Sequence, residues 1–249
     1  MMDFRKSGEL IDEVGKLLTT QPPALIAARL SLAKGRTHFR FNRLEEAAAV
    51  LDKAASQAEV LGDDGYETRV VAQIMRAGVA GYRNRIEQAQ TIYSQAIELC
   101  QERGDRVHLA VVHGNRYHLW LMRGDAQRAV EDSLICRQIG RETGFSEIEY
   151  VSSYNLAEIY YYNADREGGA PYLRRAVEME PSNSKRPLSW LLELRILVFD
   201  DSLEEASVLL ERLSKNQREM RASGDLDGLF TNAEELLYEM IQLALGDGE

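Results

Sequence analysis

The sequence predicts an all-α fold, a right-handed α-solenoid of about five helix pairs with an N-terminal helix and a C-terminal capping helix. A segment in which a turn leads into a helix recurs five times, and these segments end 42, 40, 40 and 37 positions apart, at Ala47, Ala89, Ala129, Gly169 and Ala206. The 249 residues include only five prolines, and no strand pattern separates the segments. A period near 40 without strands is typical of stacked helix pairs, none of which buries its apolar face alone.

The first 22 residues contain the expected N-terminal helix. An amphipathic pattern runs from Ser7 to Leu18. Its apolar residues share one side of a helix: Leu10, Ile11, Val14, Leu17 and Leu18. Pro22 and Pro23 end this segment, and Pro23 suits the first turn of the next helix.

Five helix pairs are expected in residues 23–225. Their approximate bounds are 23–63, 64–105, 106–144, 145–186 and 187–225. Glycine follows the second helix of four repeats, where a left-handed residue would close that helix. These glycines are Gly62, Gly104, Gly144 and Gly224.

Residues 226–249 are expected to cap the array, because its last repeat would otherwise expose an apolar face. The pattern predicts a helix from Asn232 to Leu245. Its inward residues are expected to be Leu236, Leu237, Met240, Ile241 and Ala244. From Asp200 to Glu249 the chain has 13 acidic and 4 basic residues, so this end is either a solvated cap or a surface for a partner.

The fourth repeat carries a resemblance to a known family. Its first helix contains Asn-Leu-Ala-Glu-Ile-Tyr from Asn155 to Tyr160, and Gly169, Leu173, Ala176 and Pro181 follow. This order of large, small and aromatic residues resembles the tetratricopeptide repeat. Other repeats have small residues at the same places: Gly35, Ala54, Ala77 and Ala96. The Leu-Gly-Asp endings and a period above 34 resemble the longer subclass, of about 40 residues, of kinesin light chain and maltose-regulator-type activators. The resemblance covers roughly Pro23 to Gly224.

Two repeats depart from this pattern. The third has Arg116 and Tyr117 where the fourth has Leu156 and Ala157. The fifth has Leu194 at the small position of its first helix. We therefore expect the fifth pair to pack differently or to merge with the cap.

Composition narrows the class of protein. The net charge of −10 disfavours general affinity for nucleic acid, which needs clustered Lys and Arg. The N-terminus has no apolar stretch of signal-peptide type, and no run reaches membrane-spanning length. Cys100 and Cys136 do not suggest a disulfide scaffold, so a cytoplasmic protein is expected. Cys136 stands where other repeats have a small residue and is expected to be buried.

No catalytic, metal or cofactor site is expected. His108, His113 and His118 recur every five residues, which spreads them around a helix and differs from the i, i+4 pairing of zinc ligands. The sequence has no glycine-rich phosphate loop, nucleophile elbow or Cys-rich cluster. We therefore expect that the chain is not an enzyme.

A basic stripe is expected on the first helix of the first repeat. The resemblance implies that the first helices line a concave groove, and Arg29, Leu32, Arg36 and Arg40 share one face. Three arginines would suit a carboxylate or phosphate on a ligand. Alternatively, they pair with glutamates of a neighbouring helix or solvate the face.

An aromatic stripe is expected on the first helix of the fourth repeat. It consists of Tyr150, Tyr154, Glu158, Tyr161 and Tyr162. Tyrosines on a concave wall offer large, stiff contact areas to a peptide. Alternatively, these rings pack against the adjacent first helix.

A depression is expected between the two stripes, where Gly78, Gly81 and Gly114 interrupt predicted helices. Glycine costs roughly 1 kcal/mol relative to alanine in a helix interior. We therefore expect a close approach there, either by the next helix or by the backbone of a ligand. Three further residues would flank the depression: Tyr82, His118 and Met122.

These expectations describe a non-catalytic signalling scaffold that binds a peptide segment of a partner protein in its groove. The arginines would hold an acidic feature of the peptide, and Tyr154, Tyr161 and Tyr162 an apolar one. An alternative is a self-association module, a homodimer within a larger protein that carries a kinase, ATPase or transcription-regulator domain. The start at Met1-Met2, which leads straight into a helix, would fit a segment of such a protein. A third reading is a sensor of a small signalling peptide.

Overall fold

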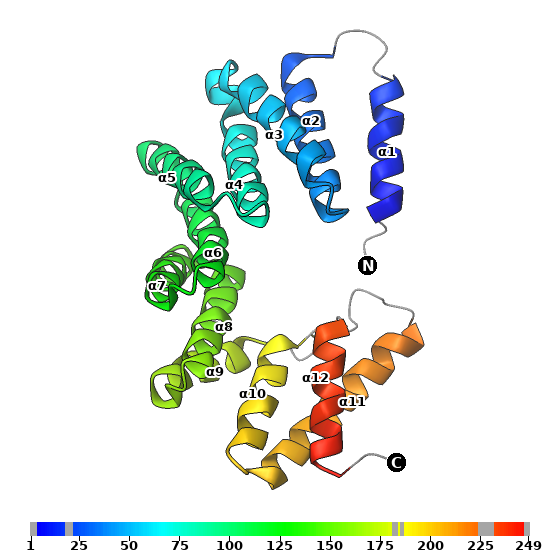
Figure 1. The fold of residues 1–249 in the computed structure, drawn as a ribbon, viewed down its shortest axis with the longest axis vertical. Helices are drawn as coiled ribbons and strands as arrows, with labels where there is room; N and C mark the ends of the chain where they lie inside the picture. Colours follow the sequence, from blue (N-terminus) through cyan, green and yellow to red (C-terminus); the bar gives the residue numbers. More distant parts are fainter. Residues whose placement is uncertain (1–3, 18–21, 181–183, 185–186, 224–231, 247–249) are drawn as a thin grey trace. The chain divides into compact units, whose positions relative to one another are not determined.

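The computed structural model describes residues 4–17, 22–180, 184, 187–223 and 232–246. It separates into two compact units, residues 2–148 and residues 149–249. Every regular element in the described residues is a helix (Figure 1). None of these helices is both long enough and apolar enough to cross a membrane.

The unit of residues 2–148 is built from successive helix pairs. Its described elements are α1 (Phe4–Leu17), α2 (Ala24–Arg40), α3 (Leu44–Glu59), the short 3-10 helix η1 (Gly62–Gly65), α4 (Tyr66–Tyr82), α5 (Ile86–Arg103), α6 (Arg106–Met122) and α7 (Ala126–Thr143). Helix α1 packs on α2. Within this unit the pair α2/α3 packs on α4/α5, and α4/α5 packs on α6/α7. The first helices α2, α4 and α6 also contact one another in order, so they form one layer.

The second unit continues the same pattern. Helix α8 (Ser146–Tyr162) crosses the boundary between the units and is followed by α9 (Arg166–Met179), α10 (Leu188–Phe199), α11 (Leu203–Ser223) and α12 (Asn232–Ala244). Helix α10 packs on α11 and also contacts α9 and α12. The predicted all-α architecture of five helix pairs, an N-terminal helix and a C-terminal cap is confirmed.

The turn inside each pair has the same backbone geometry. One left-handed residue occurs in every turn: Asn42, Asn84, Gly124, Ala164 and Asp201, with φ between 56° and 70°. The next amide donates to the carbonyl five residues earlier, as Asp165 does to Tyr160 at 2.9 Å, which closes a Schellman motif. The recurrence of these turns therefore follows the period that the sequence predicts.

Glycines also end two of the second helices as expected. Gly104 and Gly144, with φ of 69° and 75°, are the C-cap residues of α5 and α7. Gly62 is left-handed as well but begins η1, and Gly224 lies outside the described residues. The two cysteines, Cys100 and Cys136, are free and buried.

The core explains why small residues recur. A Cβ on Gly35 would lie 2.5 Å from Cδ2 of Leu51, so α2 and α3 approach each other too closely for any other residue. Gly169 is confined in the same way, because its Cβ would lie 2.8 Å from the Cβ of Tyr160. Ala77 is fully buried in the core shared by α4 and α5.

The two departing repeats pack as their sequences require. In the third, Tyr117 is buried at the small position of α6, and the residue sixteen positions later on α7 is the equally buried Ser133. In the fifth, Leu194 belongs to an apolar cluster that α10 and α11 share with Ile241 of α12. The fifth pair thus shares its apolar cluster with the cap, which agrees with the second of the two outcomes expected.

The predicted inward face of α12 is only partly correct. Ile241 is buried and Leu237 packs against the same cluster, as expected. Leu236 and Met240 are each 59% exposed, and Ala244 is exposed too, so these three predictions are wrong. Helix α12 packs against a single helix pair and therefore buries only a narrow stripe of its surface. The apolar residues of its sequence extend over a wider part of the helix.

The left-handed alanine in the α8–α9 turn should lower stability. Replacing Ala164 with glycine removes a Cβ penalty of about 1–2 kcal/mol, partly offset by the greater freedom of glycine in the unfolded chain. We expect a net stabilisation of about 0.5–1 kcal/mol, measured as a higher urea midpoint by circular dichroism. Ala49→Gly, on an exposed position of α3, is the control and should lower the midpoint. Equal effects of the two changes would contradict the turn geometry.

Candidate functional site

A cavity of about 670 Å³ lies where α1, α2 and α4 meet. Arg29, Arg36 and Arg40, the three arginines of the predicted basic stripe, all line it. The remaining lining residues are Ile11, Leu32, Ala33, Thr37, Glu67, Thr68 and Val71. The cavity is therefore basic, with Glu67 as its one acidic lining residue among those that the structure describes.

Arg29 and Arg36 are not used by the fold. Neither forms an ion pair or hydrogen bond with any residue that the structure describes, and both are exposed. The arginine of α4 at Arg69 and the C-cap residue Arg83 behave differently. Arg69 pairs with Glu59 at 2.8 Å and Arg83 with Glu45 at 3.3 Å, and both glutamates lie on α3. Pairing with a neighbouring helix therefore does not explain Arg29 and Arg36, whose guanidinium groups are available to an anion.

A second cavity, of about 250 Å³, lies over α4, α5 and α6. It contains the predicted flanking residues Tyr82, His118 and Met122, together with Gly78 and Gly81. The other lining residues are Phe39, Ile74, Met75, Ala77, Tyr93, Asn115 and Leu119. Tyr82 and Met122 are exposed at its edge, and the wall around His118 lowers the pKa of that imidazole by desolvation.

Close helix packing does not require the three glycines of this region. A Cβ on Gly78 would meet nothing nearer than the Tyr93 hydroxyl at 3.9 Å, and one on Gly114 would lie 3.7 Å from Sγ of Cys136. For Gly81 the nearest atom is Cδ1 of Leu119 at 3.4 Å. These are ordinary contact distances, so the neighbouring helices leave room for alanine at each position.

The two cavities follow one face of α4. Thr68 and Val71 line the basic cavity, and Ile74, Gly78 and Tyr82 line the second at spacings of three and four residues. The rise from Thr68 to Gly78 is about 15 Å in an α-helix. An extended peptide spans this distance with about four or five residues. One ligand segment could therefore contact both cavities.

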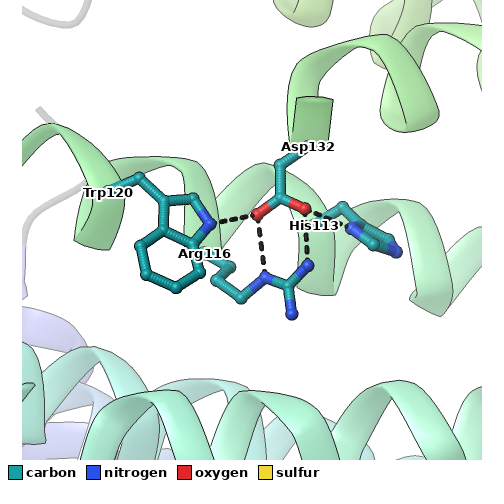
Figure 2. A network of polar contacts seen from close by, with 4 residues as sticks. All are labelled: His113, Arg116, Trp120 and Asp132. Carbon is teal, nitrogen blue, oxygen red and sulfur yellow. Dashed lines mark hydrogen bonds and ion pairs between the residues drawn. The ribbon is translucent and has the colours of Figure 1, made fainter. Parts of the chain in front are cut away.

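Helix α6, which forms a wall of the second cavity, is held by a buried polar network (Figure 2). Asp132 of α7 is 2% exposed and accepts hydrogen bonds from three side chains of α6. Arg116 donates through Nε at 2.8 Å and Nη2 at 2.6 Å, Trp120 Nε1 donates at 2.8 Å, and His113 Nδ1 lies 2.7 Å away. The network explains why the third repeat has arginine where the fourth has Leu156.

Sequence reasoning missed Asp132, although a signal was present. Its partners His113, Arg116 and Trp120 are spaced by three and four residues, so they share a face of α6. Asp132 itself stands three positions after the buried Ala129, on the packed side of α7. A charged residue at a packed position indicates a partner, because a buried charge without one is costly.

The three histidines of α6 have separate surroundings. His108 contacts Asp105 at 2.7 Å, His113 contacts Asp132, and His118 lines the second cavity. Within the described part of the chain, no three residues of the types His, Cys, Asp and Glu are arranged to hold a metal ion.

In the unit of residues 149–249, the predicted aromatic stripe divides into two groups. Tyr150 donates to Glu180 at 2.6 Å and Tyr154 donates to Glu158 at 3.0 Å, so these hydroxyls serve the fold. Burial raises the pKa of Glu158. Tyr161 and Tyr162 instead line a cavity of about 720 Å³.

This third cavity is organised by Arg195 of α10, a residue that sequence reasoning missed. Its guanidinium lies over the rings of Tyr161 and Tyr162, at 5.2 and 5.3 Å, and donates to the Tyr162 hydroxyl at 3.0 Å. Phe199 completes an aromatic edge that is largely exposed. Arg195 does not belong to the positions that define the repeat, so its contact with the two tyrosines becomes visible only in the structure.

The Asp132 network should make the free energy of unfolding depend on pH in acidic solution. Burial alone would raise the pKa of Asp132, but hydrogen bonds from Arg116 and His113 outweigh it and hold the pKa below its usual value. Because the folded pKa is lowered, the contribution to stability is complete above about pH 4 and is lost as the pH falls through the folded pKa. Asp132→Asn should cost about 3 kcal/mol at neutral pH, since it leaves Arg116 facing an amide.

Urea unfolding at a series of pH values checks this prediction. The wild type should lose stability more steeply than Asp132→Asn below about pH 4, because only the wild type has this carboxylate to protonate. Parallel curves for the two proteins would show that folding does not lower the pKa of Asp132.

One family model matches part of the chain. Residues 151–183 match the model described as tetratricopeptide repeat. The segment lies in the fourth repeat, whose residues carry the resemblance seen in the sequence. A comparison with curated proteins gave no match.

Two solved structures share the fold over nearly the whole chain. The apo form of RapI is similar with a TM-score of 0.71 and 11% identity, over 99% of this chain and 94% of that one. BtubC (BKLC) from P. vanneervenii is similar with a TM-score of 0.61 and 13% identity, over 99% of this chain and 92% of that one. At these identities the likeness shows the fold alone, an all-helical repeat architecture with a segment of tetratricopeptide type.

Proposed function

We propose that this chain is a non-catalytic protein-interaction scaffold that binds an acidic peptide segment of a partner protein along α2 and α4. The observation that carries the proposal is the basic cavity, in which Arg29 and Arg36 have no partner in the described structure. In a chain of net charge −10, unpaired arginines that share a cavity favour an anionic ligand. Arginine binds carboxylates through two parallel hydrogen bonds, which also fixes their orientation.

A peptide fits this surface better than a compact ligand. The basic cavity and the second cavity lie along one helix face about 15 Å apart, the span of about four or five extended residues. Helical repeats commonly offer such extended surfaces. Binding in the micromolar range, about −8 kcal/mol, needs no exceptional anchor.

Two buried free cysteines accord with a reducing, cytoplasmic compartment.

The aromatic edge of the second unit supplies a separate contact in this proposal. Tyr161, Tyr162 and Phe199 present stiff rings around Arg195. They suit an apolar residue of the partner, because aromatic rings give large contact area at low entropic cost. Tyr154 and Glu158 interact electrostatically with Arg195 from within the fold, whereas Tyr150 serves the contact with Glu180.

Selection from a displayed random peptide library tests the proposal. Peptides enriched on the wild-type protein should be rich in Asp and Glu, and their affinity should fall with added salt. Enrichment of peptides without acidic residues would overturn it.

Charge reversal at the basic cavity should then weaken the binding of the selected peptides. We expect Arg36→Glu with Arg40→Glu to weaken the selected peptides at least about tenfold, the loss of one charge-assisted contact. Fluorescence anisotropy measures this change. Arg85→Glu with Arg123→Glu makes the same charge change at exposed turn positions outside the cavity and should leave the affinity nearly unchanged. Equal losses of affinity in both variants would show that the effect comes from the overall electrostatic field of the protein and not from the basic cavity.

One feature favours self-association as a second candidate function. Leu236, Met240 and Leu243 of α12 share a face at spacings of four and three residues, and all three are exposed. Such a stripe is typical of a helix that pairs with another helix. The occupant in this case would be α12 of a second copy.

Light scattering over a range of concentrations checks this second candidate. The wild type should approach twice the mass of the monomer, and Leu236→Gln with Met240→Gln should remain monomeric, since the change removes the apolar contact. Ile241 is left intact in this variant, so the cap stays packed. A monomeric wild type at all concentrations would exclude the dimer.

A further inference from the structure

The second cavity is lined by a tyrosine whose hydroxyl has no hydrogen-bond partner among the described residues. Tyr93 of α5 is 3% exposed, and its side chain forms no hydrogen bond with any residue that the structure describes. The hydroxyl is not among the fully buried polar atoms of the structure, so it is accessible from the cavity and can serve a ligand. Burial raises the pKa of Tyr93, so the group stays protonated and can donate.

Gly78 leaves the backbone of α4 open beside this hydroxyl. The Tyr93 oxygen would lie 3.9 Å from a Cβ built on Gly78, and no other atom comes closer to that Cβ. Glycine is unfavourable inside a helix, and packing does not require it here. A ligand that approaches the helix closely gives a reason for glycine at this position.

The size of the cavity indicates what enters it. A volume of about 250 Å³ is below the roughly 300–1,000 Å³ of pockets for whole small molecules. It suits one side chain with its adjoining main chain. Ile74, Met75 and Leu119 make its wall largely apolar, and the Phe39 ring contacts Tyr82 edge to face at 5.3 Å between centroids.

We propose that this cavity is an anchor pocket for one large apolar side chain of the bound peptide, and that the Tyr93 hydroxyl donates to the main-chain carbonyl of that residue. The inference rests on the proposed function, because it concerns the same peptide. The anchor residue lies about four positions from the acidic residue held by Arg29 and Arg36, given the separation of the two cavities along α4. The ligand class is thus an extended peptide with an acidic and an aromatic or large aliphatic residue at this spacing.

A series of synthetic peptides tests the spacing. Each capped peptide carries a Glu pair and one Phe in a Gly-Ser background, with the number of intervening residues varied and both orders of Glu and Phe included. Anisotropy with the full chain should give the tightest binding when Phe lies about four positions from the Glu pair, with about three residues between them. Replacing Phe with Gly in the best peptide should weaken it at least about tenfold, the effect of losing one buried anchor.

Three variants test the pocket itself. Gly78→Ala should remove most of the gain from Phe, while the urea midpoint of the free protein rises because alanine favours the helix. Tyr93→Phe should weaken the peptide about three- to tenfold, the effect of one neutral hydrogen bond. Gly114→Ala is the matched control, since Gly114 is also inside a helix with room for a Cβ but lies outside the cavity lining. It should raise the midpoint without changing affinity.

The outcomes separate this inference from the proposed function. Glu-dependent binding that gains nothing from Phe, or a gain that persists in Gly78→Ala and Tyr93→Phe, overturns the anchor pocket and leaves the acidic-peptide function standing. A gain from Phe that is lost in Gly78→Ala, with no dependence on Glu or on Arg36, supports the pocket and overturns the acidic partner. No binding by any peptide of the series overturns both.

Discussion

The stack of residues 2–148 depends on matching a large side chain with a small one across each of its three helix pairs. Gly35 and Leu51, sixteen positions apart, meet so closely that the glycine has no substitute. Ala77 and Tyr93 stand at the same separation in the second repeat, and both belong to one buried cluster. Because the total volume at this crossing is limited, enlarging one member requires shrinking the other. The third repeat follows the rule in reverse, with a large residue on its first helix.

This packing rule also determines where the candidate site lies. The large residue is Leu51 in the first repeat and Tyr93 in the second, so the second repeat carries a hydroxyl at this position, and it reaches the second cavity. That hydroxyl ends beside Gly78, on the face of α4 that continues into the basic cavity. A residue chosen for packing thus supplies a polar group to the surface of the same helix.

Periodicity was sufficient to predict the fold, because every repeat has the same turn and the same small positions. The sequence stripes also placed Arg29, Arg36 and Arg40 in one cavity and Tyr82, His118 and Met122 in another. The polar partners were not predictable in this way. Tyr150 and Tyr154 bond to carboxylates on their own or a later helix, and Arg195 comes from the next repeat. Such contacts depend on side-chain direction, which residue spacing does not specify.

Helix α6 joins two kinds of environment. One side carries His113, Arg116 and Trp120, which bind Asp132, and the other carries His118 and Met122, which line the second cavity. A ligand bound on the cavity side would stabilise the packed state of α6. It would therefore reduce the local unfolding of the α6–α7 pair. Amide hydrogens of α7, which has no residue in that cavity, would then exchange more slowly with solvent when the cavity is filled. The buried carboxylate of Asp132 would in this way couple ligand occupancy at α6 to the dynamics of α7.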